Sequence, residues 1–298
     1  MADTLLLLDA YSLIYRAFYA IRSLTGPDGQ PVNAIYGLTK MLRKMIADHR
    51  PKYYAAVFDL GAPQKRLDLL PSYKAHRPPT PPDLDKQLPA IREILQAMRV
   101  PIVEIEGEEA DDIIATLAIQ GVGDGHDVLI ASNDKDFMQI VSPRIRLLRP
   151  DGKEAAIIDP AGVEARYGVK PGQIVDFLSL LGDAVDNIPG APGVGEKTAA
   201  QLLQTHGTLE GILAHVADIA KPKLREALIA SAERVRANRQ LIALQTDVPL
   251  PVAMDALKVQ PPDPVALAPL FRHFGFKSLL AELEKPAGQG EMNLFASN

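Results

Sequence analysis

The sequence predicts an α/β protein in which a mostly parallel central sheet is flanked by helices and followed by a helical C-terminal region. Two patterns indicate this organisation. In the first half of the chain, short apolar runs that end in an acidic residue alternate with helical patterns. After about residue 160, helical patterns follow one another with only short glycine turns between them. Alternating strands and helices favour a parallel sheet that is covered on both faces.

The first region is expected to hold four strands and three helices. The strands are short apolar runs at residues 4–9, 53–59, 100–106 and 127–134. The helical patterns between them occupy residues 33–49, 84–99 and 111–120. We assign residues 1–165 to this core, with its boundary between residues 155 and 175.

The second region, residues 166–286, carries helical patterns along its whole length. They lie at residues 172–181, 196–206, 209–215, 223–244 and 264–284. Residues 287–298 are expected to form a flexible tail, because chain ends without a packing pattern are commonly disordered.

Residues 62–82 fit neither region. This segment holds four cationic side chains against one acidic side chain, and it closes on the proline-rich run 78–82. It is longer than an ordinary connection, and loops of that length are commonly functional or disordered.

The composition excludes several kinds of site. The chain of 298 residues has no apolar run near 18 residues, so no membrane span is expected. It has no cysteine, which excludes disulfides, thiolate metal sites and a cysteine nucleophile and agrees with a cytoplasmic location. The six histidines are scattered, so a histidine-based zinc cluster is not expected.

Acidic side chains follow the end of each expected strand. Because the carboxyl ends of parallel strands meet at one edge of a sheet, these side chains are expected to converge there. Two further acids, in the string GDAVDNIPG, can join them from the helical region. The full set is Asp9, Asp59, Glu109, Asp111, Asp112, Asp134, Asp136, Asp183 and Asp186.

Clustered carboxylates raise one another's pKa unless a cation compensates their charge. Oxygen ligands of this kind suit Mg²⁺ or Mn²⁺, and two such ions suit phosphodiester hydrolysis. Taken singly, each acid is explained as well by a helix cap or a solvated turn. The repetition at four strand ends is what favours a metal site.

The net charge of −5 is unusual for a protein that binds nucleic acid. Setting aside the nine clustered carboxylates changes the balance to +4, so the rest of the chain is mildly basic. The acidic total therefore weighs only weakly against DNA.

Several strings together resemble the polymerase I 5′-nuclease family, the bacterial relatives of flap endonucleases. They are LLLLDAYSLIYRAFYA, NAIYGL, VFD, YKAHRPPTPPDLDKQLP, EADDIIATLA, NDKDFMQIV and VDNIPGAPGVGEKTA, in family order over roughly residues 4–285. The resemblance implies a PIN-like 5′-nuclease core with an arch or clamp at about residues 62–99. It also implies a helix-hairpin-helix-type motif at residues 187–206.

The same resemblance assigns the acids to two ion sites, so that two or more Mg²⁺ or Mn²⁺ ions are expected. Asp9, Asp59, Glu109, Asp111 and Asp112 match the first site. Asp134, Asp136, Asp183 and Asp186 match the second. All nine are present, which implies an active enzyme.

A glycine-rich turn opens into a helix at residues 190–198. Glycines let a phosphate approach the backbone, and a helix N-terminus offers free N–H groups; an ordinary interhelical turn with a glycine cap is the other interpretation. The resemblance implies contacts with the backbone of duplex DNA, with K⁺ as a candidate bound ion. The candidate DNA-binding residues of this turn are Gly190, Gly193, Gly195, Lys197 and Thr198.

By resemblance, Arg16 lies on the first helix near the metals, and Lys74 and Arg77 lie on the arch that admits a single-stranded 5′ end. Cations there would hold the scissile phosphate and stabilise transition-state charge, so all three are candidate catalytic residues. Arg66 and Tyr73 are candidate DNA-binding residues of the same segment, with Tyr73 and Tyr15 able to stack an unpaired base. From the residues alone, each cation is equally a solvated surface charge.

The sequence departs from the family pattern at two places. Glu108 stands where the family often has an aromatic residue, and we expect it to point to solvent rather than to join the metal site. Gln64 and Lys65 stand where an aromatic residue often precedes the arginine matched by Arg66.

The function expected is a structure-selective 5′→3′ exonuclease or 5′-flap endonuclease that removes primers and flaps in replication and repair. The expected substrate is DNA with a free 5′ end or 5′ flap, with RNA–DNA hybrid as a further candidate. We expect a monomer in the bacterial cytoplasm, associated with the nucleoid. A stand-alone nuclease and the N-terminal part of a polymerase both remain open.

Two other functions compete with this one. A non-catalytic DNA-binding scaffold would use the glycine-turn hairpin alone, but loss of metal acids would favour it and none is lost. An α/β phosphotransferase or phosphatase would use the carboxylates on small substrates, but the chain has no Walker P-loop and carries the DNIPG hairpin.

Overall fold

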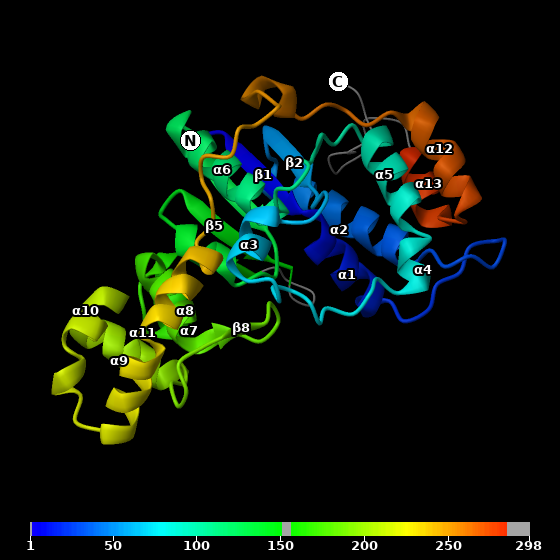
Figure 1. The fold of residues 1–298 in the computed structure, drawn as a ribbon. Coiled ribbons are helices and arrows are strands. Elements are labelled where there is room, and N and C mark those ends of the chain that lie inside the picture. Colours follow the sequence, from blue (N-terminus) through cyan, green and yellow to red (C-terminus); the bar gives the residue numbers. More distant parts are fainter. Residues whose placement is uncertain (1, 151–155, 285–298) are drawn as a thin grey trace.

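The computed structural model describes residues 2–150 and 156–284 of the chain. Within these ranges one six-stranded sheet has the order β3-β2-β1-β4-β5-β6 (Figure 1). Strands β1 to β5 run parallel and β6 runs antiparallel to β5, which confirms the predicted mostly parallel sheet. The strands are β1 (Thr4–Asp9), β2 (Tyr53–Val57), β3 (Ile102–Val103), β4 (Asp127–Ala131), β5 (Ile145–Arg149) and β6 (Ala156–Ile158).

The central strand β1 is apolar on both faces because both faces are covered. Leu5 and Leu7 belong to the core under α6 (Ala110–Gly123). Leu6 and Leu8 belong to the core under α1 (Ala10–Ala20), α2 (Asn33–His49) and α5 (Leu88–Ala97). A strand buried on both sides needs apolar residues at every position, and this explains the continuous run of leucines.

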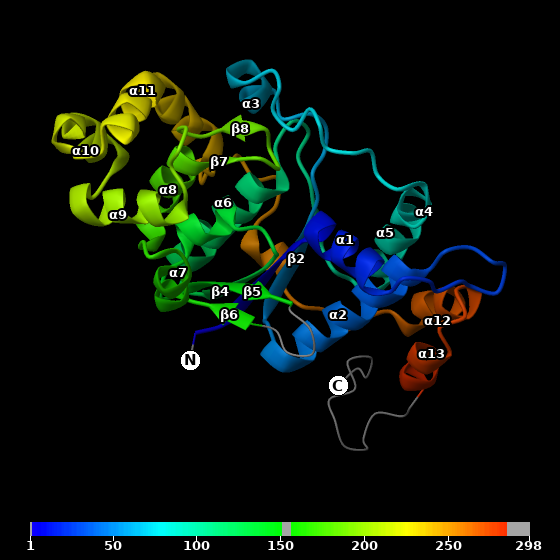
Figure 2. The same ribbon diagram turned by 90° about the horizontal axis from the view of Figure 1, so that it is seen from below.

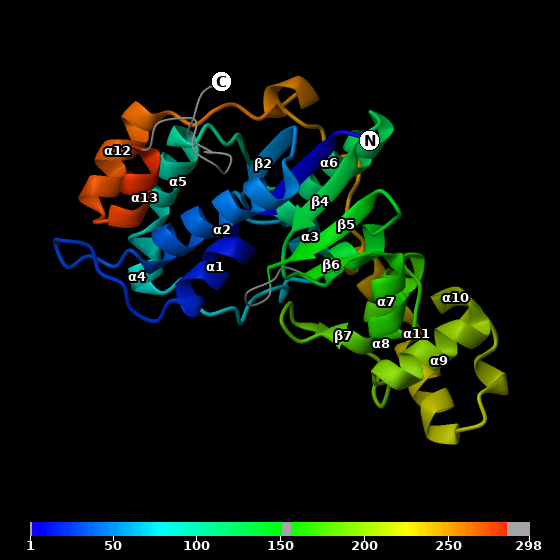
Figure 3. The same ribbon diagram turned by 180° about the vertical axis from the view of Figure 1, so that it is seen from behind.

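The helical region forms a lobe at the end of the sheet (Figures 1 and 3). Its apolar side chains are continuous with the core under α6, so the lobe and the sheet share one hydrophobic cluster. A small hairpin of β7 (Gly182–Asp183) and β8 (Ile188–Pro189) follows α8. The helices are α7 (Pro160–Tyr167), α8 (Ile174–Leu181), α9 (Glu196–His206), α10 (Leu209–Ala214) and α11 (Pro222–Ile242).

The last two helices pack against the helices that cover one face of the sheet. The sequence pattern groups residues 264–284 with the helical region as a single helix. The structure divides them into α12 (Pro264–His273) and α13 (Lys277–Leu283), separated at Gly275, whose φ is 73°. Both helices pack beside α5 and α2, away from α9 and α10, because Phe271 and its apolar neighbours complete that core (Figure 1). The expected flexible tail at 287–298 lies outside the described residues.

The basic segment, residues 62–82, crosses the molecule. It starts with α3 (Gln64–Leu69) beside the helical lobe and passes to α4 (Pro82–Asp85) and α5 on the other side (Figure 2). The sequence pattern predicts one helix at 84–99. The structure has two helices there, because α4 ends at Asp85 and α5 begins at Leu88 with a proline in its first turn. Strands β5 and β6 and helix α7 are not predicted by the sequence pattern.

In the described part of the chain, no helix is long and apolar enough to span a membrane.

Candidate metal centre and nucleic-acid site

An open cavity of about 520 Å³ lies where the carboxyl ends of the strands meet the helical lobe. Six of the nine predicted acids line it. Three lie at the end of a strand or in the loop that follows it, one lies in the first turn of α6, and two lie in the β7–β8 hairpin. They are Asp9, Asp59, Asp134, Asp111, Asp183 and Asp186.

Backbone geometry aims the acids of β1 and β2 at this cavity. Asp9 ends β1 and caps α1, where its side chain accepts a hydrogen bond from the Ser12 N–H at 3.2 Å. Its second oxygen accepts from the Ser132 hydroxyl at 2.6 Å. Asp59 accepts from the Ala110 N–H at 2.9 Å and so joins the end of β2 to the start of α6. Each carboxylate is fixed through one oxygen or both before any ligand arrives.

A second group of acids offers closely spaced ligand atoms. One carboxylate oxygen from each of Asp136, Asp183 and Asp186 lies within 4.8 Å of the others. Among the described residues, Oδ1 of Asp136 is buried and has no hydrogen-bond partner. A buried oxygen without a partner is costly unless an ion or water satisfies it. These donors fit a hard divalent cation such as Mg²⁺ or Mn²⁺.

The pKa values of the cluster reflect burial and crowding. Burial, reinforced by the neighbouring carboxylates Asp134 and Asp59, raises the pKa of Asp9 to about 7. Burial, followed by the charge of Asp134, raises the pKa of Asp111 and of Asp136 well above the usual range. Without a cation, these carboxyl groups therefore keep protons toward neutral pH, and a bound cation would favour their ionised form.

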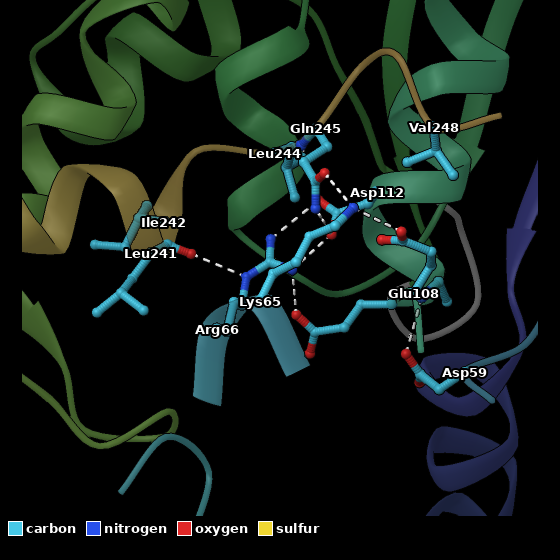
Figure 4. A network of polar contacts seen from close by, with 12 residues as sticks. Asp59, Lys65, Arg66, Glu108, Asp112, Leu241, Ile242, Leu244, Gln245 and Val248 are labelled. Carbon is cyan, nitrogen blue, oxygen red and sulfur yellow. Dashed lines mark hydrogen bonds and ion pairs between the residues drawn. The ribbon is translucent and has the colours of Figure 1, made fainter. Parts of the chain in front are cut away.

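Two predicted ligands, Glu109 and Asp112, do not line the cavity. Asp112 is fully buried and accepts two hydrogen bonds from Arg66, at 2.5 and 2.9 Å (Figure 4). Glu109 is buried among cations and a hydroxyl: it pairs with Arg66 at 2.5 Å and with Lys74, and the Tyr73 hydroxyl donates to it at 3.3 Å. In this structure both acids contact the arch segment instead of lining the cavity.

Lys74 and Arg77 line the acidic cavity. Arg77 pairs with Asp186 at 2.5 Å, and Lys74 pairs with Glu109. Backbone and side-chain contacts join their segment to the β7–β8 hairpin: the Lys74 N–H donates to the Asp186 carbonyl at 3.1 Å. The side chain of Asn187 donates to the Ser72 carbonyl at 2.8 Å. The two cations are thus held at the rim of the acid cluster.

The other predicted arch and helix residues lie elsewhere. Arg16 lines a different cavity, between α1 and α2. Arg66 and Tyr73 are both 6% exposed, so neither offers a free surface to DNA in this structure. Tyr15 does line the acidic cavity, and its hydroxyl donates to Thr80 at 3.2 Å.

Glu108 does not point to solvent as expected. Its carboxylate pairs with Lys65 at 2.6 Å, and its side chain is only 15% exposed. It does not line the acidic cavity either. The two positions at which the sequence departs from the family pattern are therefore partners, because an ion pair joins them.

Family models match most of the chain. Residues 4–168 match the model described as 5′-3′ exonuclease, N-terminal resolvase-like domain. Residues 169–265 match the model described as 5′-3′ exonuclease, C-terminal SAM fold. The chain belongs to the 5′-3′ exonuclease family. This confirms the resemblance drawn from the motifs.

Curated relatives of this 5′-3′ exonuclease family member include bacterial DNA polymerases I. That of Bacillus caldotenax is 39% identical over 99% of this chain and 34% of its own length. The thermostable enzyme of Thermus aquaticus is 39% identical over 94% of this chain and 33% of its own length. The chain thus spans about a third of the length of the curated relatives it matches.

Solved structures share the fold at lower identity. The bacteriophage T5 D15 protein, co-crystallised with metal ions, gives a TM-score of 0.66 at 21% identity, covering 80% of this chain and 89% of that one. The catalytic core of Rad2 in complex with a DNA substrate gives 0.63 at 16% identity, covering 94% and 91%. These likenesses confirm the PIN-like sheet with its helical extension.

The glycine-rich turn lies at the start of α9, and none of its predicted contact residues lines the acidic cavity. Gly190 is required by packing, because a Cβ there would lie 2.0 Å from the Leu181 carbonyl oxygen. Gly193 and Gly195 face open space. Lys197 is exposed and Thr198 half-buried on the first turn of α9. The fold alone therefore accounts for Gly190 but offers no steric reason for Gly195.

Sequence reasoning missed several residues that line the cavity. Lys135 pairs with Asp183 at 2.6 Å, and it stands within the string NDKD that was already singled out for its acids. Ser12 lies in the first turn after Asp9, where a capping position could have indicated it. Asn133 and Val185 likewise stand beside predicted acids, in the strings NDKD and GDAVDNIPG. The remaining lining residues have no such neighbouring acid in the predicted set, apart from Tyr11 near Asp9; they are Tyr11, Arg149, Arg166 and Tyr167.

The raised pKa of Asp9 predicts a pH-dependent stability difference in Asp9→Asn. The folded protein holds a proton on Asp9 up to about pH 7, whereas the unfolded chain loses it near pH 4. Wild type in EDTA therefore loses stability as pH rises from about 4 to about 7, and the neutral variant lacks this contribution of Asp9. At pH 8 the variant should gain up to about 4 kcal/mol over wild type, and at pH 5 the gain should fall to about 1–2 kcal/mol. Thermal unfolding of both proteins in EDTA at both pH values measures this difference. A stability difference between variant and wild type that is no larger at pH 8 than at pH 5 would contradict the prediction.

Proposed function

We propose that this chain is a structure-selective 5′ nuclease that hydrolyses phosphodiesters of DNA with a free 5′ end or a 5′ flap, using two or more Mg²⁺ or Mn²⁺ ions. The observation that carries the proposal is the set of six carboxylates around one open cavity with Lys74 and Arg77 at its rim. Membership of the 5′-3′ exonuclease family supports it. So do the solved relatives whose names include metal ions, DNA substrate and flap endonuclease.

The donor sets suggest which residues would hold the ions. Asp9, Asp59, Asp111 and Asp134 gather at the strand ends. Asp136, Asp183 and Asp186 offer a compact second set, with one buried oxygen unsatisfied. When bound, divalent ions supply Lewis-acid stabilisation and lower the pKa of a water molecule. Glu109 and Asp112 would support these sets from behind, through their contacts with the arch.

The chain's own cations would orient and stabilise the phosphate. Lys74 and Arg77 are at present paired with Glu109 and Asp186, and an incoming phosphate would compete with these carboxylates for them. Cations held in place before the reaction stabilise charge that develops in the transition state without a reorganisation cost. The arch segment above the cavity would restrict access to an unpaired 5′ strand.

The glycine-rich turn would hold the duplex away from the cutting site. Gly193 and Gly195 leave the backbone open, and the N-terminus of the eleven-residue helix α9 offers N–H groups to a phosphate. Lys197 adds a charge, and K⁺ is a candidate ion at this turn. Contacts of this kind position DNA without reading its sequence. We extend the proposal to RNA–DNA hybrid substrates, to action as a monomer and to a bacterial nucleoid location.

Cleavage of an end-labelled 5′-flap duplex tests the function. With Mg²⁺ the wild-type chain should release the flap, and with EDTA cleavage should stop while flap binding persists. Asp134→Ala should bind the flap and lose most turnover, because it removes a candidate ion ligand and no phosphate contact. Binding without cleavage by wild type in Mg²⁺ would favour the DNA-binding scaffold instead. Full cleavage in EDTA would exclude the metal mechanism.

Lys74 should contribute to the chemical step more than to binding. Lys74→Met keeps the aliphatic stem at a residue whose φ is 55° and removes only the charge. We expect its single-turnover rate at saturating enzyme to fall, because the activation barrier should rise by about 2–4 kcal/mol. This is comparable to the loss of one oxyanion donor. Lys86→Met is the control, because Lys86 is an exposed cation beside α4 that does not line the cavity.

An unchanged rate at saturating enzyme would remove Lys74 from the catalytic set. If only flap affinity fell, and added KCl reproduced the defect in wild type, Lys74 would be an electrostatic tether.

A further inference from the structure

Three segments that are distant in sequence meet at one buried arginine. The guanidinium of Arg66, on α3, donates from Nη1 and Nη2 to both oxygens of Asp112 on α6. Its Nε donates to the carbonyl of Leu241, near the end of α11, at 3.0 Å. Figure 4 shows these contacts converging between the arch, the acid-bearing helix and the end of the helical lobe. Arg66 also pairs with Glu109 at 2.5 Å.

Asp112 is held from a second side by the segment after α11. The Gln245 N–H donates to its Oδ1 at 2.8 Å, and the Gln245 side-chain amide donates to its Oδ2 at 3.3 Å. Asp112 is fully buried, so its charge depends on these donors and on Arg66. Removing one partner of a buried ion pair leaves an uncompensated charge, which is strongly unfavourable.

An outer ion pair closes the same junction. Lys65 donates to Glu108 at 2.6 Å and to the Gln245 side chain at 2.9 Å. The Lys65 side chain is largely exposed, so solvent screens its charge and its pair with Glu108 contributes little stability. The buried contacts of Arg66 therefore hold the junction, and Lys65 only covers it.

The junction bears on the metal site through the first turn of α6. Glu109, Ala110, Asp111 and Asp112 are consecutive there, and Asp111 lines the cavity. The Ala110 N–H binds Asp59 on the cavity side, while Asp112 binds Arg66 on the opposite side. The direction of Asp111 thus depends on a turn that is anchored on both sides.

We propose that Arg66 is a positioning residue for ion binding: it fixes the first turn of α6 against the arch and the helical lobe, and it does not contact DNA. Its Nε, Nη1 and Nη2 are all engaged with the protein, and its side chain is buried. This inference rests on the proposed nuclease function for its kinetic consequence, but ion binding can be measured without DNA. Partners that orient metal ligands commonly change metal affinity or activity 10–100-fold when they are replaced.

The test compares Arg66→Gln, Arg66→Lys and the double variant Arg66→Gln/Asp112→Asn with wild type. Arg66→Gln leaves the buried Asp112 carboxylate without its arginine and can fail to fold for that reason. The double variant removes both charges of this pair, so it can be tested in that case. Arg144→Gln is the matched control. Arg144 also pairs with an aspartate, Asp127, and reaches a backbone carbonyl, but at the opposite edge of the sheet. Melting temperatures identify the folded variants and set the working temperature.

For each folded variant, Mn²⁺ affinity is measured by calorimetry without DNA, and flap affinity is measured in EDTA. The single-turnover rate is then followed against Mg²⁺ concentration. We expect Arg66→Gln and the double variant to lose about 10–100-fold in Mn²⁺ affinity or in rate. Arg66→Lys should recover part of the loss, because it keeps the charge without the planar fork. Flap affinity should match that of Arg144→Gln.

Unchanged Mn²⁺ affinity and rate in the double variant would overturn the positioning role. So would a loss of flap affinity at unchanged Mg²⁺ dependence, which would make Arg66 a DNA contact. A wild-type chain that binds Mn²⁺ but leaves the flap intact would instead overturn the proposed nuclease function, and Mn²⁺ affinity would still decide the role of Arg66.

Discussion

Repulsion among carboxylates at one edge of the sheet is the constraint on which the rest of the site depends. Asp9, Asp111 and Asp136 have raised pKa values because they are buried beside other acids. The fold counters this charge by bringing chain cations to it, and Lys135 and Arg77 pair with Asp183 and Asp186. The pairing leaves one buried oxygen of Asp136 unsatisfied within the described residues. Divalent ions would complete the compensation that the side chains begin.

The same charge explains why the arch and the helical lobe meet the sheet where they do. The arch cations are attracted to the acids, and the backbone of Lys74 hydrogen-bonds to the β7–β8 hairpin. Arg66 enters behind the acids and joins α6 to the end of α11. Electrostatic contacts and the apolar core both hold the two regions together.

Local chemistry decided which features the sequence could predict. Continuous apolar strands and the acids at their ends depend only on residues that are adjacent in the sequence. The parallel sheet and the convergence of six acids were therefore predictable. The directions of Glu109 and Asp112 were not, because they depend on Arg66, which lies more than 40 residues away in the chain. The burial of Arg66 and Tyr73 likewise follows from packing that no local pattern records. The pairing of Lys65 with Glu108 could have been suspected only by considering both departures from the family pattern together.

The most direct test of this account is calorimetric titration of the wild-type chain with Mn²⁺ at pH 6.5, in buffers that differ in ionisation enthalpy. If burial and carboxylate repulsion keep protons on the cluster, ion binding must release them, and the measured heat must vary with the buffer. We predict binding of at least two ions per chain with net proton release, and a smaller release in Asp9→Asn. Absence of binding, or binding with no proton release in any buffer, would contradict it.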